Sequence, residues 1–160
     1  MLISRFLMIF VALSTVSSTS FAGAIELRPN DPVYVKMGEK VYLGQCASCL
    51  VVNLEEQVGW QDTMVDGMRL APPHDKSGHT WHHPDEMLFN LTKYGFKAMI
   101  NDDYQVSMPV YDGILSDEEI IASLSYIKSK WPKDVFEIHD RINTDFKTYK
   151  EIENQSKSTQ

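Results

Sequence analysis

The sequence predicts an all-α domain, and three observations support this fold class. Apolar residues recur at helical spacing in three separate segments, with start or stop signals near their ends. Two long segments between them contain glycines and prolines that interrupt regular structure. No stretch of alternating apolar and polar residues is long enough to indicate a sheet. We therefore expect a bundle of three to five short helices with long connecting loops.

The first helical segment is predicted over residues 32–45. Asp31 and Pro32 fit a helix start, since aspartate caps a first turn and proline suits its first position. Gly38 interrupts the pattern, which favours a close approach of another backbone at that point. The apolar positions of this segment are Val33, Met37, Val41 and Tyr42.

Two long loops separate the predicted helices. Residues 50–73 and 96–115 contain no helical pattern, and loops of this length in a compact domain usually enclose something or carry function. The helix between them is predicted from Pro84 to about Tyr94, where Gly95 is well placed to end it.

The strongest local signal is the capping box that begins at Ser116 and includes Glu119. The amphipathic helix that follows has its apolar positions at Ile120, Leu124, Ile127 and Trp131. Pro132 is expected to end or kink this helix. Residues 133–160 are predicted to form a helical extension, with a frayed tail from 154 onward.

The N-terminal residues have the pattern of a secretory signal peptide. Arg5 precedes an apolar run over residues 6–13, and Ser20-Phe21-Ala22 fits the small-x-small cleavage pattern. The run is shorter than the ~20 residues of a membrane span. We expect residues 1–22 to be removed, leaving a domain over 23–132 with no membrane span and the extension over 133–160. Cleavage after Ala24 and an uncleaved N-terminal anchor are the alternatives.

The formal net charge of −7 argues against binding to nucleic acid or to an anionic membrane surface. A partner with a basic face would suit a chain of this charge. No Ser-His-Asp arrangement, Gly-rich phosphate loop or catalytic arrangement of paired carboxylates stands out in the sequence. We therefore expect a protein that is not an enzyme.

Cys46 and Cys49 are the two cysteines of the chain, separated by two residues. Followed by histidine, such a pair is the signal for covalent c-type haem attachment, in which the cysteines form thioethers and the histidine ligates iron. Position 50 is leucine, which has no lone pair to offer iron. In an oxidising compartment, a disulfide is the alternative. A thiol oxidoreductase is the least expected function, since the helical pattern lies before Cys46 and not after it.

The order and spacing of these motifs resemble the class I c-type cytochromes, in particular a subgroup of small bacterial periplasmic monohaem proteins. Gly38 and Tyr42 match the first helix of the family, and Leu124 and Ile127 match the helix that crosses it. The more specific motifs are Ala71-Pro72-Pro73-His74-Asp75, the run from Gly78 to Glu86 with His79-Thr80-Trp81-His82-His83, and Lys93-Tyr94-Gly95.

The resemblance implies a haem pocket with haem c bound through Cys46 and Cys49, and with Met108 as the distal iron ligand. It also implies that Trp81 donates its indole N–H to a haem propionate. The expected function is one-electron transfer by a periplasmic monomer to a redox partner protein. The chain departs from the family where Leu50-Val51 replaces His-Gly. The proximal iron position is then vacant or taken by a non-standard ligand.

A second hypothesis comes from the histidines, four of which lie between residues 74 and 83. His79, His82 and His83 could together hold Cu(II) or Zn(II). The chain would then be a haem-free binding module with the same fold and a Cys46–Cys49 disulfide. Alternatively, these histidines are residues near the haem edge or solvated loop residues.

Overall fold

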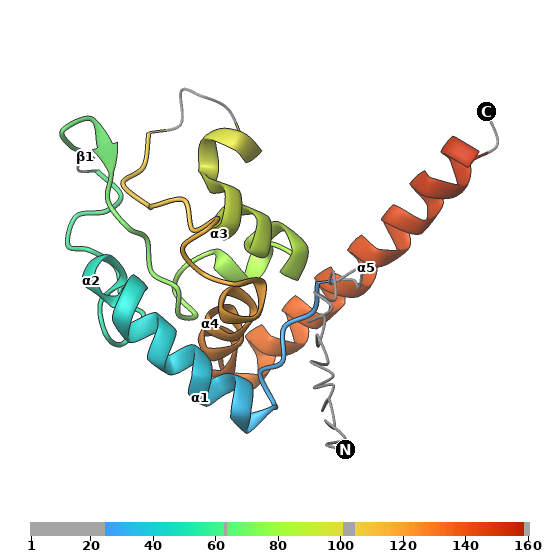
Figure 1. Cartoon of the computed structure of the whole chain (residues 1–160), viewed down its shortest axis with the longest axis horizontal. Coiled ribbons are helices and arrows are strands. Elements are labelled where there is room, and N and C mark those ends of the chain that lie inside the picture. The colour runs from blue at the N-terminus through green and yellow to red at the C-terminus, as the bar shows by residue number, and fades with distance from the viewer. Residues whose placement is uncertain (1–24, 63, 101–104, 159–160) are drawn as a thin grey trace, which may run out of the picture.

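The computed structural model describes residues 25–62, 64–100 and 105–158. The described chain is mostly helical, which confirms the predicted all-α class (Figure 1). The predicted signal peptide, residues 1–22, lies outside the described residues. No helix in the described ranges has the length and apolar character needed to cross a membrane.

The first helical segment is continuous through the cysteines. Helix α1 (Pro32–Val41) leads into a π-helical turn, η1 (Tyr42–Cys46), and then into the short helix α2 (Ala47–Leu50). Asp31 caps α1 as predicted, since its Oδ1 accepts the backbone N–H of Val33 at 2.8 Å. The helical segment therefore ends five residues later than predicted, and its π-helical turn lies directly at Cys46.

Helix α4 (Asp117–Ser129) crosses α1, and Gly38 lies at the crossing. A Cβ atom at Gly38 would overlap the carbonyl oxygen of Ala122, so only glycine permits this backbone approach. The rings of Tyr42 and Tyr126 pack beside it with their centroids 5.4 Å apart. The predicted close crossing is confirmed, as is the capping box of Ser116 and Glu119. The core around the crossing includes Leu54, Leu88, Phe89, Ile120, Ile121, Leu124, Ile127 and Trp131.

Helix α3 (Asp85–Met99) packs against α4 and is longer than predicted. Gly95 was expected to end it, and its φ of 82° and ψ of 165° do break the helical geometry there. A further helical turn begins after this kink and runs to Met99. The predicted end of the helix at Gly95 is confirmed, and the turn after it was not predicted.

The loop predicted over residues 50–73 contains a short hairpin. Strands β1 (Met64–Val65) and β2 (Met68–Arg69) pair antiparallel around Asp66 and Gly67. Both turn residues have positive φ angles, 52° and 78°, which is why an Asp-Gly pair favours this turn. Arg69 also pairs with Val106, so the hairpin lies beside the segment that precedes Met108.

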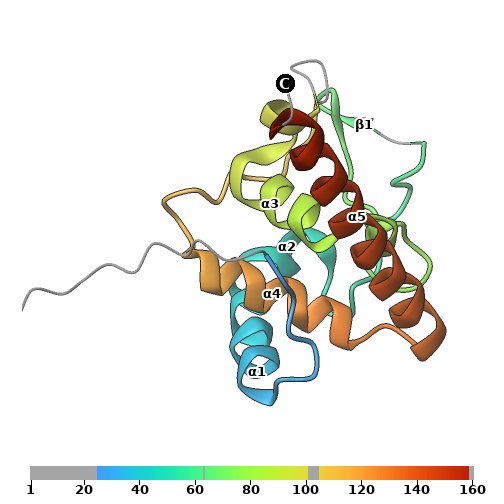
Figure 2. The same cartoon turned by 90° about the vertical axis from the view of Figure 1, so that its right-hand side faces the viewer.

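Helix α5 (Lys133–Ser158) forms the C-terminal extension and packs against the 3₁₀ turn η2 (Thr80–His82) (Figure 2). Its second half projects away from the other helices (Figure 1). The helix continues through residues 154–158, where fraying was expected, while 159–160 lie outside the described residues. An ion pair of 2.6 Å between Lys157 and Glu153 supports the last turns of this helix.

Candidate functional site

The two cysteines lie at the end of the first helical segment, three residues apart. Cys46 is half-buried at the end of η1, and Cys49 is exposed in α2. Both are free thiols, so the alternative of a Cys46–Cys49 disulfide is not realised in this structure. Burial raises the pKa of the Cys46 thiol, although a hydrogen bond with Tyr111 acts in the opposite direction. A neutral, half-buried thiol is a poor nucleophile, which argues against a thiol oxidoreductase.

Two tyrosines fix the backbone on either side of the cysteines. The Tyr111 hydroxyl donates to the carbonyl of Gln45 at 2.8 Å, and the Tyr42 hydroxyl donates to the carbonyls of Leu50 and Val51 at 3.1 and 2.6 Å. Burial raises the pKa of Tyr111 to about 12 and also raises that of Tyr42, so both hydroxyls keep their protons. Sequence reasoning did not identify Tyr111, for which the only signal was its position shortly after Met108.

The backbone at Leu50 and Val51 has the conformation of a glycine turn. Leu50 is half-buried against the core. Val51 has φ 55° and ψ 156°, a region of backbone conformation that is essentially reserved for glycine. A β-branched residue there is strained. The turn after the cysteines therefore persists even though Val51 stands where the family resemblance places glycine.

Replacing Val51 with glycine is expected to stabilise the protein by about 1 kcal/mol. Relief of backbone strain is worth about 1–3 kcal/mol, and the higher chain entropy of glycine offsets about 0.5–1 kcal/mol of it. The side chain of Val51 is 36% exposed, so part of its packing is lost as well, which keeps the net gain small. The free energy of unfolding in denaturant measures the effect.

The matched control is Val52→Gly at the neighbouring position. Val52 is 58% exposed and is not among the described residues with positive φ. The free energy of unfolding of Val52→Gly should be lower than that of the wild type by about 0.5–1 kcal/mol, because only the entropy cost of glycine applies. A Val51→Gly protein that is destabilised as much as Val52→Gly would contradict the strain at Val51.

Trp81 lies in the turn η2 and carries an unusual feature. Its indole Nε1 is buried and has no hydrogen-bond partner, the single such side-chain atom in the described part of the chain. The His82 ring stacks on the indole at a centroid distance of 3.7 Å. A buried donor without an acceptor is rare in folded proteins, since it costs about 1–3 kcal/mol. The indole N–H of Trp81 therefore lacks the acceptor that a buried donor usually has.

The three histidines of the predicted metal site lie in and beside the turn η2. His82 is exposed and stacks on Trp81, while the rings of His79 and His83 meet edge to face at 5.6 Å. Across residues 25–62, 64–100 and 105–158, no three His, Cys, Asp or Glu side chains are arranged to hold a metal ion. His79 and His83 therefore face each other, whereas His82 faces Trp81.

Met108 lies in an irregular segment that is tied at both ends. The pairing of Arg69 with Val106 holds the segment to the hairpin, and the bond from Tyr111 to Gln45 holds it to the residue before Cys46. Met108 itself is 36% exposed. Further large apolar side chains are exposed on these loops and on the last turn of α3: Val51, Val52, Met64, Val65, Met68, Met99, Ile100 and Val110. These loops therefore present several apolar side chains to solvent.

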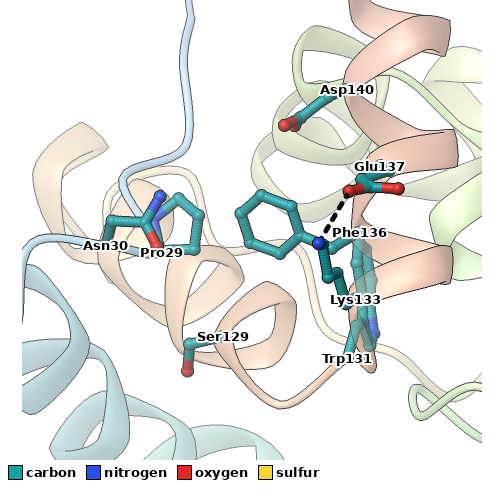
Figure 3. Close-up of a pocket in the computed structure, with 8 residues that line it drawn as sticks. All are labelled: Pro29, Asn30, Ser129, Trp131, Lys133, Phe136, Glu137 and Asp140. Atoms are coloured by element: carbon teal, nitrogen blue, oxygen red, sulfur yellow. Dashed lines mark ion pairs between the residues drawn. The ribbon is translucent and has the colours of Figure 1, made fainter.

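Two cavities lie away from these residues. One of about 480 Å³ lies between residues 29–30, the end of α4 and the start of α5, where the Phe136 ring faces Pro29 (Figure 3). A neighbouring cavity of about 350 Å³ reaches Asp85, Lys128 and Asn143. Neither is lined by Cys46, Cys49, Trp81, Met108 or the three histidines of the proposed metal site.

A comparison with protein families matches the model of cytochrome c to residues 35–131, more than half of the chain. The chain belongs to the cytochrome c family. The matched residues include the α1–α4 crossing, both cysteines, Trp81 and Met108, whereas α5 follows them. Comparisons with curated proteins and with solved structures gave no significant match.

Cytochromes c are haem-binding electron carriers, and the cysteines of this family member have the spacing of the haem attachment motif. The free thiols, the exposed apolar loops and the unpartnered Trp81 donor all fit a porphyrin with its propionates. The proximal ligand does not fit, because Leu50 has no donor atom. The site therefore matches the ring of the cofactor and not one of its usual iron ligands.

Proposed function

We propose that this cytochrome c is an exported, periplasmic one-electron carrier whose iron has a non-standard or vacant proximal position. Haem c would be held by thioethers to Cys46 and Cys49, with Met108 as an iron ligand. The haem supplies the one-electron couple when it is bound. The protein would act as a monomer and as a carrier, without substrate chemistry of its own.

The observation that carries the proposal is the buried, unpartnered Nε1 of Trp81. The family resemblance implies that this indole donates to a propionate. An ionised carboxylate is a strong acceptor for such a donor, and the bond would remove the cost of leaving the indole N–H unsatisfied. Nothing else in the described residues supplies an acceptor to this atom.

The other residues of the site would hold the group and shield it. Cys46 and Cys49 present their thiols from one helical turn, and the hydroxyls of Tyr42 and Tyr111 hold the backbone beside them. Loss of the proximal histidine is expected to change the reduction potential, since axial ligands are a main determinant of haem potential. The net charge of −7 favours a redox partner with a basic face.

The test is a visible spectrum of the protein exported in a host with the c-type maturation system, recorded after denaturation. We expect a Soret band that stays with the denatured chain. Cys46→Ser together with Cys49→Ser should remove it, whereas Ser48→Ala, between the two cysteines, should keep it. A folded but colourless protein would contradict the proposal and favour the haem-free binding module.

A further inference from the structure

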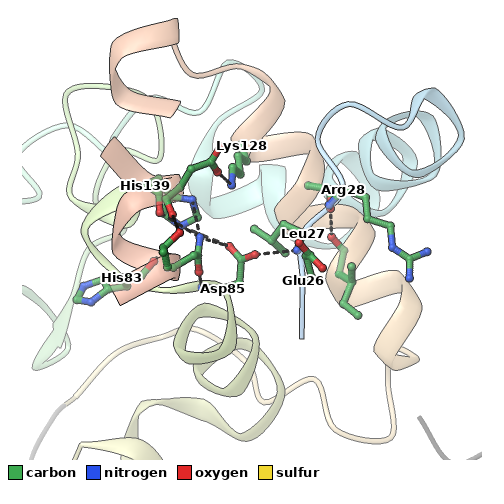
Figure 4. A network of polar contacts seen from close by, with 12 residues as sticks. Glu26, Leu27, Arg28, His83, Asp85, Lys128 and His139 are labelled. Carbon is green, nitrogen blue, oxygen red and sulfur yellow. Dashed lines mark hydrogen bonds and ion pairs between the residues drawn. The ribbon is translucent and has the colours of Figure 1, made fainter. Parts of the chain in front are cut away.

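Two residues of helix α5, His139 and Asn143, form hydrogen bonds to the segment that contains Trp81. Figure 4 shows His139 beside His83 and Asp85. His139 Nε2 lies 3.0 Å from the carbonyl oxygen of His83 and must be the donor, because a carbonyl only accepts. Asn143 pairs with Asp85 in both directions: its side-chain oxygen accepts the Asp85 backbone N–H at 2.8 Å, and its amide donates to Asp85 Oδ1 at 3.0 Å. His139 and Asp85 are 0% and 5% exposed, so these contacts are shielded from water.

Burial keeps the ring of His139 neutral. Burial lowers the pKa of His139, and nearby Lys128 lowers it further, while Asp85 acts in the opposite direction. Lys128 is itself buried and paired with Asp140 at 2.6 Å. A neutral ring has one N–H, and the contact with His83 places it on Nε2. His139 Nδ1 is then free to accept from the Asn143 amide, 3.3 Å away.

Trp131 holds the other end of this segment, at His74. Trp131 Nε1 donates to the carbonyl of His74 at 2.8 Å, and His74 Nδ1 lies 3.0 Å from the hydroxyl of Thr80. The rings of Trp131 and His139 meet edge to face at 4.9 Å. Residues 74–85 are therefore held at both ends by groups that also contact each other.

We infer that His139 and Asn143 are positioning residues for Trp81. By fixing the backbone at His83 and Asp85, they keep the buried, unpartnered indole N–H of Trp81 in a fixed place. Without such support, the turn would shift to let water or another acceptor reach the donor, because an unsatisfied buried donor is unfavourable. Both residues lie in α5, after the stretch matched by the family model. The inference rests on the proposed function for the identity of the acceptor, a haem propionate.

The test is hydrogen exchange of the Trp81 indole N–H, followed by NMR in the full chain expressed without the maturation system. The indole signal that disappears in Trp81→Phe is the signal of Trp81, which distinguishes it from the signals of Trp60 and Trp131. We expect Asn143→Ala and His139→Leu to speed the exchange by about tenfold or more, because local opening becomes easier. His139→Gln, whose amide can donate in place of Nε2, should restore slow exchange. Asn154→Ala makes the same substitution as Asn143→Ala on an exposed turn of α5 and should leave the exchange unchanged.

A purely structural role for α5 predicts a different result. In that case Asn143→Ala and His139→Leu would speed exchange equally at Trp81 and at the backbone amides of the α1–α4 crossing, and His139→Gln would restore neither. That outcome, or unchanged Trp81 exchange in folded variants, overturns the inference. A wild-type chain that fails to take up haem would overturn the proposed function alone, since the exchange measurement does not require haem.

Discussion

A Leu50→His chain is expected to carry covalent haem at roughly ten times the wild-type level or more, because an iron ligand contributes at least as much as the outer contacts around it. The turn that would present this histidine already exists. Tyr42 holds the carbonyls of Leu50 and Val51, and Val51 keeps the backbone conformation of a glycine. The ratio of Soret absorbance to protein, measured after denaturation of the exported chain, reports the effect.

The control for this prediction is Val52→His, which places a histidine two residues further on an exposed loop. It should leave haem attachment at the wild-type level, because the position of the imidazole matters and not its presence. A Leu50→His protein that folds and gains no haem over Val52→His would show that the rest of the pocket no longer accepts the cofactor.

The largest loss of stability is expected from Gly38→Ala. The added Cβ would overlap the carbonyl oxygen of Ala122 across the α1–α4 crossing, where neither backbone can rotate away. Forcing the two helices apart should cost about 2–3 kcal/mol, which lowers the melting temperature by about 5–10 °C. Thermal unfolding followed by circular dichroism measures it.

Gly44→Ala is the matched control, since a Cβ at Gly44 meets nothing within 4 Å. Its stability should be unchanged or higher by up to about 1 kcal/mol, because alanine restricts the unfolded chain more than glycine does. Equal losses in Gly38→Ala and Gly44→Ala would mean that helix geometry, and not the crossing, controls stability here.

The sequence predicted the elements whose signals are local. Asp31 and Ser116 cap helices as expected, because each capping contact lies within a few residues of the cap. Gly38 indicated the helix crossing, because a glycine inside a helix is unfavourable unless another backbone packs closely against it. The hairpin at Asp66 and Gly67 was overlooked although an Asp-Gly pair favours one, since its two-residue strands carry no alternating pattern.

The features missed in the sequence depend on distant pairs of residues. Asn143 meets Asp85 across 58 positions, and no periodicity in either helix indicates that contact. The unpartnered indole of Trp81 is likewise a property of three-dimensional packing. The histidines at 79, 82 and 83 are close in sequence, but their three rings do not all meet: His79 contacts His83, and His82 stacks on Trp81.

The carboxylate of Asp85 joins three stretches of chain, because it also accepts the backbone N–H of Leu27 at 2.8 Å in addition to contacting α5 (Figure 4). A chain that emerges from its N-terminus presents Cys46 and Cys49 long before Asn143 is available. The turn with Trp81 cannot reach its final state until the C-terminal helix arrives, and contacts between such distant residues form slowly. The order of synthesis thus makes both thiols available before the turn that carries Trp81 is fixed by α5.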